Sequence, residues 1–440
     1  MKKKAAFYTL GCKVNYCETE SLQTLFEQAG YRIADFEEQA DVYVINTCTV
    51  TGLSDHKSRK AIRRARKRSP EAVIVATGCY AQGEPEKIKE MEQVDLIIGN
   101  RERENLPDII DNLQRGSVLD LVTAHGNNES FEILPPVRRR GRTRGFLKIQ
   151  EGCNQNCSYC IIPKVRGPLR SLPPDQVLLR ARSLVESGSR EIILTGIHLG
   201  LYGADLEAVT LASLLRELET IPDLLRLRLS SLEPSDITSE LVEAIIDSKI
   251  VCPHLHIPLQ SGDGEILRKM NRPYEPDEFL YLAKWLKQEI PGLALSSDLI
   301  VGFPGESEHH HRRSMALVHD IGFSRLHVFK YSSRPGTRAV TLPGHLPNEI
   351  KDERSKEMIK LGETLSSEYR KQFIGTVQPV LVEKVVPYEY GEGFTPHYLR
   401  VKISSEIKGL HWRGREVKTL ILGETDSGLT GEHARCLKRP

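Results

Sequence analysis

Three cysteines in one short segment are the residues best suited to chemistry. Cys153, Cys157 and Cys160 stand at relative positions 0, 4 and 7. Thiolates at this spacing in a loop can bind three irons of a cubane iron–sulfur cluster and leave the fourth iron open. A zinc site is one alternative, but zinc usually takes four protein ligands, and no fourth Cys or His lies nearby in the sequence. Three buried structural cysteines are the other alternative, so the spacing favours a cluster with an open iron.

A second set of cysteines follows apolar runs in the first quarter of the chain. Cys12, Cys48 and Cys79 end the segments TLGC, INTC and TGC. Because ligands of open α/β sheets bind outside the carboxyl ends of the strands, we expect these residues to converge there. Each one alone could be a small buried hydrophobic residue. The chain has nine cysteines and no recognisable secretory signal, so clustered cysteines indicate metal ligation or catalysis rather than disulfides.

The first region, residues 1–125, alternates short apolar runs with helical patterns. This order predicts an open, largely parallel α/β sheet. The predicted strands are Ala5–Leu10, Val42–Asn46, Ala72–Thr77 and Asp95–Ile98, and the predicted helices are Glu18–Ala29, Ser54–Arg68 and Glu84–Glu92. A polar stretch with Gly and Pro, about 123–144, predicts a linker.

The second region, residues 140–372, contains six strand candidates with helical patterns between them. Six β/α units predict a partial (β/α)6 barrel whose chemistry lies at the carboxyl ends of its strands. The strand candidates are Phe146–Gln150, Glu191–Thr195, Leu225–Ser230, His254–Pro258, Leu295–Val301 and Arg325–Phe329. The 153–160 motif follows directly after the first of them, and a charged amphipathic helix, Asn348–Phe373, closes the region.

The last region, residues 373–440, has a different pattern. Val377–Val385, Tyr398–Ile403 and Val417–Gly423 are short and β-branched, and Gly and Pro break them. Such segments predict a small antiparallel β-barrel.

The motifs together resemble one known family over nearly the whole chain. TLGCKVN, VINTCTVT and TGCYAQ surround the first three cysteines, and SSLEP, HLHIPLQSGDGEILRKMNRPY and DLIVGFPGE follow the 153–160 motif. This set resembles the radical S-adenosylmethionine methylthiotransferase family. The resemblance implies an amino-terminal cluster domain, a radical S-adenosylmethionine barrel and a carboxy-terminal TRAM-like RNA-binding domain. It also implies two 4Fe–4S clusters and S-adenosylmethionine as cofactors.

By this resemblance the two sets of cysteines have different roles. The 153–160 motif would hold the cluster that cleaves S-adenosylmethionine reductively to a 5′-deoxyadenosyl radical, so that the cofactor carries the difficult chemistry. The first three cysteines would hold a second cluster that supplies or carries the inserted sulfur. Cys17 is an extra thiol near Cys12, and Lys330 stands where the family often has proline.

Within the family, TLGCKVN, Cys160–Ser171 and LTGIHLG look most like one branch that acts on transfer RNA. The resemblance implies that the substrate is N6-threonylcarbamoyladenosine next to the anticodon and that the product is its 2-methylthio derivative. Two alternatives use the same chemistry, on an aspartate of a ribosomal protein or on isopentenyl-adenosine in transfer RNA. A more distant alternative is a non-enzymatic RNA-binding metalloprotein.

The cofactor site is predicted at the carboxyl ends of the barrel strands. Tyr159 would shield the cluster or pack against a bound cofactor, although core packing explains it equally well. A glycine at the end of a strand would let the backbone closely approach the methionine or adenine part of the cofactor, although a simple turn is the alternative. Glu233 could bond the ribose hydroxyls. The candidates are Tyr159, Thr195, Gly196, Glu233, Gln260, Asp298 and Gly302.

The charge is unevenly distributed along the chain, because two basic runs occur although the net charge is only +2. Eight basic residues and no acidic residue lie between Lys57 and Arg68, and six lie between Arg138 and Lys148. A solvated helix face or a linker would explain such runs. Two runs beside cysteine motifs favour a polyanionic partner, because each cation that neutralises a phosphate releases counterions. The predicted phosphate contacts are Lys57, Arg59, Lys60, Arg63, Arg64, Arg138, Arg139 and Arg140.

The remaining expectations concern partners and location. No apolar run reaches the ~18 residues of a membrane span, so we expect no membrane contact and a cytoplasmic protein. The resemblance implies transfer RNA as partner and an electron donor such as flavodoxin or ferredoxin. Nothing in the sequence indicates an oligomeric state.

Overall fold

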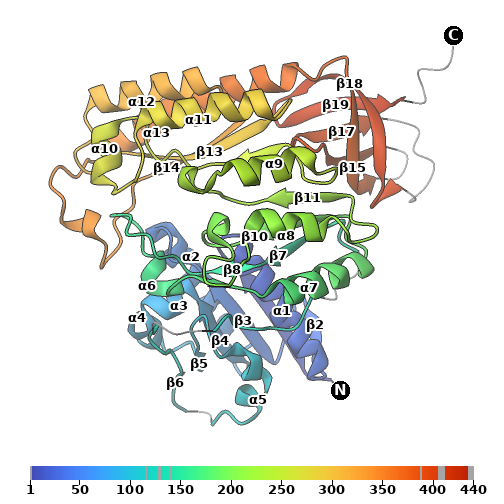
Figure 1. Cartoon of the computed structure of the whole chain (residues 1–440). Coiled ribbons are helices and arrows are strands. Elements are labelled where there is room, and N and C mark those ends of the chain that lie inside the picture. Colours follow the sequence, from blue (N-terminus) through green and yellow to red (C-terminus); the bar gives the residue numbers. More distant parts are fainter. Residues whose placement is uncertain are drawn as a thin grey trace.

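The computed structural model describes residues 2–114, 116–126, 130–137, 141–386, 389–404 and 412–434 (Figure 1). None of the helices in these ranges is both long enough and apolar enough to cross a membrane.

The amino-terminal part is a six-stranded sheet in the order β2-β1-β3-β4-β5-β6. Every pairing in it is parallel, which confirms the predicted open α/β sheet. The strands are β1 (Lys4–Thr9), β2 (Arg32–Ala34), β3 (Val42–Thr47), β4 (Val73–Gly78), β5 (Leu96–Ile97) and β6 (Leu119–Asp120). The helices are α1 (Lys13–Gln28), α2 (Gly52–Arg68), α3 (Cys79–Gly83), α4 (Pro85–Lys89), η1 (Arg103–Asn105) and α5 (Leu106–Asp111).

Apolar cores cover both faces of this sheet. Tyr43 and Ile45 of β3 pack on one face with Ile62 of α2. Val44 packs on the other face with Phe26 of α1. Successive residues of a strand point to opposite faces, so a central parallel strand covered by helices must be apolar throughout. This explains why β3 is readable in the sequence as a continuous apolar run.

The central part is an open barrel of two three-stranded parallel sheets, β11-β10-β7 and β12-β13-β14. Isolated parallel bridges join Leu227 of β11 to Val251, and Ser231 to His256 of β12. This confirms the predicted partial (β/α)6 barrel. Its strands are β7 (Arg144–Lys148), β10 (Glu191–Thr195), β11 (Arg226–Leu229), β12 (His254–His256), β13 (Ala294–Val301) and β14 (Arg325–Lys330).

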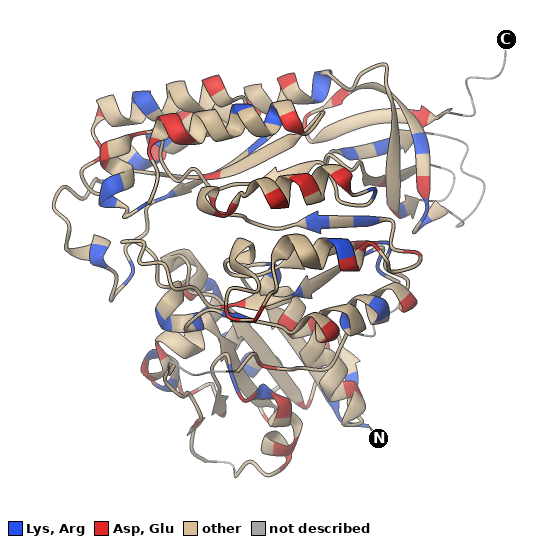
Figure 2. Cartoon of the chain, in the orientation of Figure 1, with Lys and Arg blue, Asp and Glu red and all other residues tan. Residues whose placement is uncertain are grey.

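Further elements connect the barrel strands and cover them. The short strands β8 (Gln150–Glu151) and β9 (Arg170–Ser171) pair beside the barrel. The helices are α6 (Ile162–Arg166), α7 (Pro174–Glu186), η2 (Leu199–Leu201), α8 (Leu211–Leu218), η3 (Pro234–Asp236), α9 (Ser239–Asp247), α10 (Gly264–Lys269), α11 (Pro276–Glu289), α12 (Glu308–Ile321), η4 (Arg338–Thr341) and α13 (Asn348–Lys371). Acidic and basic residues are interspersed on α11–α13, as expected for solvated helix faces (Figure 2).

The carboxy-terminal part is a closed barrel in the order β15-β16-β17-β19-β18. Its strands are β15 (Val377–Val386), β16 (Tyr390–Phe394), β17 (Arg400–Ser404), β18 (Glu416–Thr425) and β19 (Gly428–His433). The predicted small antiparallel β-barrel is confirmed, with one exception, since β17 and β19 run parallel. A ring of five strands cannot alternate direction throughout, so one pair has to be parallel.

The carboxy-terminal barrel packs against the end of the central barrel at which the strands begin (Figure 1). Arg226 at the start of β11 donates to the Phe394 and Pro379 carbonyls at 2.7 and 2.8 Å. The guanidinium of Arg228 lies 4.4 Å from the Tyr398 ring centroid, and the His254 ring lies 4.9 Å from it. Tyr398 is therefore a packing residue of this junction, which leaves the carboxyl ends of the barrel strands for the cysteine loops.

Candidate active site

Cys12, Cys48 and Cys79 lie at the carboxyl ends of β1, β3 and β4, which are neighbours in the sheet. The structure therefore places the three residues at one sheet edge, where strand order predicts a ligand crevice. The loops also approach each other closely. Gly11 has φ +102°, and a Cβ there would lie 3.0 Å from Sγ of Cys48, so only glycine fits between the two loops.

The environment of these thiols suits a bound metal cluster. Cys48 and Cys79 are buried and Cys12 is exposed. Burial raises the pKa of Cys48 and raises that of Cys79 to about 12, whereas the nearby Arg166 lowers both. Buried thiols with raised pKa values ionise readily only when they bind a metal. Thiolates are the ligands that iron–sulfur clusters take, so the donor set fits such a group.

Cys17, the extra thiol near Cys12, does not belong to this site. It is buried, and its Sγ lies 3.5 Å from the Phe146 carbonyl oxygen of β7. Burial raises the pKa of Cys17 to about 12. It is an unreactive packing residue in this setting.

Cys153, Cys157 and Cys160 occupy the loop between β8 and α6, and all three are half-buried. The amide of Cys153 donates to the Gly167 carbonyl at 3.1 Å, and the amide of Cys160 donates to the Cys157 carbonyl at 3.1 Å. Gly152 precedes the loop with φ +69°, and a Cβ there would lie 1.9 Å from the Pro168 carbonyl oxygen. The loop is thus fixed to the segment that follows α6.

Two cations that sequence reasoning missed face this loop. His198 Nδ1 lies 3.6 Å from Cys153 Sγ, and its Nε2 lies 2.7 Å from Asp236. Although burial opposes protonation, the hydrogen bonds to Asp236 and Cys153 raise the pKa of His198 to about 10. Arg272 donates to Cys157 Sγ at 3.4 Å. Both cations stabilise thiolates, which fits ligands of an iron–sulfur cluster.

No three His, Cys, Asp or Glu side chains within the described ranges surround a single ion position. A cubane cluster makes a different demand on its ligands, because each thiolate binds its own iron. The two cysteine sets are therefore described as candidate cluster sites.

A cavity of about 200 Å³ is lined by Cys160 and by two residues that follow Cys48. One wall is Val50 and Thr51, which follow Cys48. The facing wall is formed by the 159–162 segment, which includes Cys160, and by the ends of barrel strands. The lining residues are Val50, Thr51, Tyr159, Cys160, Ile161, Ile162, Gln260, Asp298, Ile300, Phe329, Lys330, Tyr331 and Ser332.

Three of the predicted cofactor residues line this cavity, namely Tyr159, Gln260 and Asp298. The Tyr159 ring meets the Phe303 ring edge-on, with centroids 6.4 Å apart. Gln260 has φ +62°, a left-handed conformation that is costly for any residue other than glycine and that clusters at functional sites. Asp298 pairs with Nε2 of His256 at 3.2 Å.

The other predicted cofactor residues are not among those that line the cavity, and they lie close to other parts of the protein. Glu233 forms an ion pair with Arg272. The Thr195 carbonyl accepts from the Ile149 amide at 3.0 Å. A Cβ at Gly196 would lie 2.8 Å from Gln150 Oε1. The Gly302 amide donates to both carboxylate oxygens of Glu306 at 3.1 Å. Glu233 thus acts on the 153–160 loop through Arg272.

The basic run on α2 divides into paired and free residues. Lys57, Lys60 and Arg63 are exposed. Arg59 donates to the Tyr80 hydroxyl at 2.8 Å, and Arg64 pairs with a glutamate and covers an aromatic ring. Thr51 lines the cavity, and α2 begins at the next residue. The exposed cations of α2 therefore lie on a helix that starts at the cavity wall. The predicted contacts Arg138, Arg139 and Arg140 lie outside the described residues.

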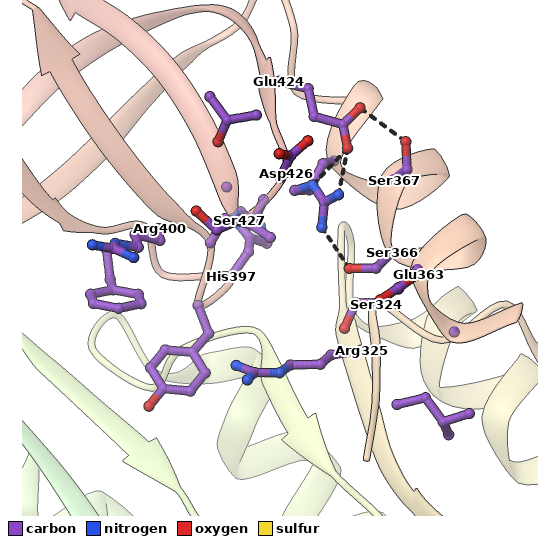
Figure 3. Close-up of a pocket in the computed structure, with 18 of the residues that line it drawn as sticks. Ser324, Arg325, Glu363, Ser366, Ser367, His397, Arg400, Glu424, Asp426 and Ser427 are labelled. Atoms are coloured by element: carbon purple, nitrogen blue, oxygen red, sulfur yellow. Dashed lines mark hydrogen bonds and ion pairs between the residues drawn. The ribbon is translucent and has the colours of Figure 1, made fainter. Parts of the chain in front are cut away.

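A larger cavity, about 1070 Å³, lies where α13 and the carboxy-terminal barrel meet the start of β12 and β14 (Figure 3). Glu424 accepts from Arg370 Nη2 at 2.5 Å and from Ser367 at 2.9 Å, and Arg370 also donates to Ser366 at 2.8 Å. None of the described residues that line it is a cysteine. The smaller cavity is therefore the candidate reaction site.

Phe394 and Trp412 of the carboxy-terminal barrel are engaged in packing. The Arg144 guanidinium lies 4.3 Å from the Phe394 ring centroid. Trp412 packs against the barrel core, with its ring 5.1 Å from that of His433.

Comparison with known proteins identifies relatives of the whole chain. Residues 4–99 match the family described as Uncharacterized protein family UPF0004, and residues 147–318 match the Radical SAM superfamily. The threonylcarbamoyladenosine tRNA methylthiotransferase MtaB of Bacillus subtilis is 43% identical, covering 90% of this chain and 89% of that protein. The tRNA-2-methylthio-N(6)-dimethylallyladenosine synthase of Pelotomaculum thermopropionicum is 37% identical, with 87% of each chain covered.

A solved structure shows the same architecture. The radical S-adenosylmethionine methyltransferase TsrM of Kitasatospora setae, with cobalamin and a 4Fe–4S cluster bound, has a TM-score of 0.56 and 17% identity, covering 77% of this chain and 74% of that chain. At this identity the likeness shows the fold alone. The relatives at higher identity show the family: the chain belongs to the radical S-adenosylmethionine methylthiotransferases, in the branch of the threonylcarbamoyladenosine enzymes.

Proposed function

We propose that this protein adds a methylthio group at C2 of N6-threonylcarbamoyladenosine next to the anticodon of transfer RNA. The observation that carries the proposal is the cavity of about 200 Å³ walled by the residues after Cys48 and by the loop of Cys160. A methylthiolation needs a radical source and a sulfur source at the same carbon atom. A cavity lined by Cys160 and by the residues after Cys48 would bring both sources to one carbon atom.

The cofactors of the family are 4Fe–4S clusters and S-adenosylmethionine. When bound, they supply a 5′-deoxyadenosyl radical at the 153–160 loop and the inserted sulfur at the Cys12, Cys48 and Cys79 site. Tyr159, Gln260 and Asp298 would orient the reactants, because they line the cavity. Tyr159 packs against Phe303 and would exclude water from the radical.

The charges at the 153–160 loop are set by the protein. Arg272 lies 3.4 Å from Cys157 Sγ, and Glu233 holds Arg272 in place through an ion pair. His198 lies against Cys153. These residues would position the ligands and neutralise part of the negative charge of a bound cluster.

Transfer RNA would approach along α2. Lys57, Lys60 and Arg63 are exposed cations on a helix that starts beside the cavity, so phosphates on them would bring a nearby base to the cavity mouth. An anticodon-loop base is already accessible, so little unpairing energy is needed. The β15–β19 barrel lies at the far end of the central barrel, and an RNA that contacts both ends must extend along it (Figure 1).

Lys330 favours the threonylcarbamoyl substrate over a dimethylallyl one. The threonyl group carries a carboxylate, whereas the dimethylallyl group is apolar. Lys330 lines the cavity, and its Nζ lies 2.5 Å from Asp352, with both side chains half-exposed. Exposed ion pairs contribute only about 0–1 kcal/mol, so a substrate carboxylate can compete with Asp352 for the ammonium group.

The reaction requires a one-electron donor, for which we propose a flavodoxin or ferredoxin, and the cytoplasm is the compartment in which transfer RNA would be modified. Mass spectrometry of transfer RNA nucleosides from a deletion strain tests the substrate. We expect 2-methylthio-N6-threonylcarbamoyladenosine to disappear and its unmethylthiolated precursor to accumulate. An unchanged level of the methylthio nucleoside would contradict the proposal, and loss of methylthio-aspartate from a ribosomal protein would support the rival substrate.

A further inference from the structure

Arg166 connects the two cysteine sites. It is the last residue of α6, the helix that follows the loop of Cys160, and its side chain is fully buried. Its Nε donates to Sγ of Cys79 at 3.1 Å. Through this hydrogen bond, the segment that follows the 153–160 loop contacts a cysteine of the other site.

The rest of the guanidinium group holds the loops of the other two cysteines. Nη2 of Arg166 donates to Oδ1 of Asn15 at 2.6 Å. Asn15 Nδ2 in turn donates to the carbonyls of Leu10 and Thr47 at 2.8 and 3.0 Å. Leu10 stands two residues before Cys12, and Thr47 stands one residue before Cys48. One side chain thus reaches all three cysteine loops, one directly and two through Asn15.

Arg166 is kept charged by a buried ion network at the junction of the amino-terminal sheet and the barrel. Its Nη1 lies 2.5 Å from Glu18 and 3.1 Å from Glu151. The network contains three cations and three carboxylates: Arg103, Lys148, Arg166, Glu18, Glu132 and Glu151. Such a balanced network is rigid only while each member is paired.

We infer that Arg166 is a positioning residue that raises the reduction potential of the cluster at Cys12, Cys48 and Cys79. Net charge and hydrogen bonds to the sulfurs set the potentials of iron–sulfur clusters. A cation and an N–H group beside a ligand sulfur stabilise the more negative, reduced state. The inference rests on the proposed function, since it requires a cluster at these three cysteines.

The test is a redox titration of reconstituted full-length protein, followed by electron paramagnetic resonance. Removal of Arg166 alone would leave buried carboxylates unpaired, so Arg166→Gln is combined with Glu151→Gln to keep the network balanced. The matched control is Glu151→Gln alone, because Glu151 contacts Arg166 and Lys148. Arg166→Lys, which keeps the charge and lacks the planar fork, separates charge from hydrogen-bond geometry.

We expect the double variant to hold a normal amount of iron and to show a lower potential at the Cys12 site than its control. The expected shift is about a tenfold change in the reduced fraction at fixed solution potential, or about 59 mV for a one-electron couple. The cluster at the 153–160 loop should keep its potential. Arg272→Lys provides the reciprocal case, because Arg272 donates to Cys157, and should shift only that second cluster.

An unchanged potential at the Cys12 site in the double variant, with full iron content, would overturn the inference. An equal shift of both clusters would also overturn it, because Arg166 would then act only on the junction as a whole. If wild-type protein binds iron only through the 153–160 cysteines, the proposed function itself fails. Iron analysis of a Cys153→Ala, Cys157→Ala, Cys160→Ala variant distinguishes this case.

Discussion

Arg334 Nη1 lies 2.8 Å from Oδ2 of Asp55, and this buried ion pair joins the segment after β14 to the first turn of α2. Arg334 also donates to the Thr49 carbonyl at 3.0 Å, one residue after Cys48. A few residues on, the Ala339 amide donates to the Ser158 carbonyl at 2.7 Å, within the 153–160 loop. The segment after β14 therefore holds both cysteine loops around the cavity.

Loss of Arg334 should destabilise the protein and uncouple the cleavage of S-adenosylmethionine from methylthiolation. Removal of one partner of a buried pair costs about 3 kcal/mol, because the other charge remains unpaired. We expect Arg334→Gln to lower the free energy of unfolding by this amount in denaturant titrations. We also expect more 5′-deoxyadenosine per methylthiolated nucleoside. The double variant Asp55→Asn, Arg334→Gln should recover part of the stability, and additive losses would argue against the pair.

The two sets of cysteines should separate the two halves of the chemistry. Cys157→Ala should abolish 5′-deoxyadenosine formation. Cys48→Ala should retain it and form no methylthio nucleoside. Each variant should lose about four of about eight irons after anaerobic reconstitution. Retention of 5′-deoxyadenosine by Cys157→Ala would show that the radical arises elsewhere.

Lys330 should discriminate between modified adenosines. We expect Lys330→Ala to lower kcat/KM for threonylcarbamoyladenosine transfer RNA about 10-fold to 100-fold, the value of one to two charge-assisted contacts. The cleavage of S-adenosylmethionine without RNA should not change. Lys351→Ala is the control, because its ammonium lies 5.6 Å from the Tyr331 ring centroid and is not part of the cavity wall. Equal losses in the two variants would remove the role assigned to Lys330.

The exposed cations of α2 should contribute to the salt dependence of RNA binding. Replacement of Lys57, Lys60 and Arg63 by Gln should reduce the slope of log K against log salt by about 2–3, since each phosphate contact contributes nearly one. Fluorescence anisotropy with a labelled anticodon stem-loop measures this slope. Gln substitutions at exposed Lys356 and Lys360 of α13 serve as the control. A slope unchanged from wild type in the α2 variant would place the RNA elsewhere.

The sequence predicted the fold well because apolar runs are local patterns, whereas the assignment of the two cysteine sets to clusters stays a prediction. Continuous apolar runs marked β3 and β4, and strand order alone brought Cys12, Cys48 and Cys79 to one edge. Strand β2, with three residues, and strand β6, with two, are too short to show a period and were not predicted.

Residues whose role depends on distant partners could not be predicted in this way. Arg166 and Arg272 contact cysteines more than 80 positions away in the chain, and no spacing signals such contacts. The prediction that Glu233 bonds the ribose hydroxyls stays a prediction, and its ion pair with Arg272 could not be read from the sequence. Arg59 belongs to a basic run, yet it donates to Tyr80 across the helix interface. Charge runs show how many cations exist but not which of them already have partners.

An isotope-labelling experiment tests most directly whether two clusters act on one substrate carbon in one cavity. The reconstituted protein is reduced anaerobically with S-adenosylmethionine and transfer RNA that carries deuterium at C2 of threonylcarbamoyladenosine. The account predicts 2-methylthio-N6-threonylcarbamoyladenosine and deuterium in the 5′-deoxyadenosine that accompanies it. Unlabelled 5′-deoxyadenosine together with unchanged threonylcarbamoyladenosine would contradict it.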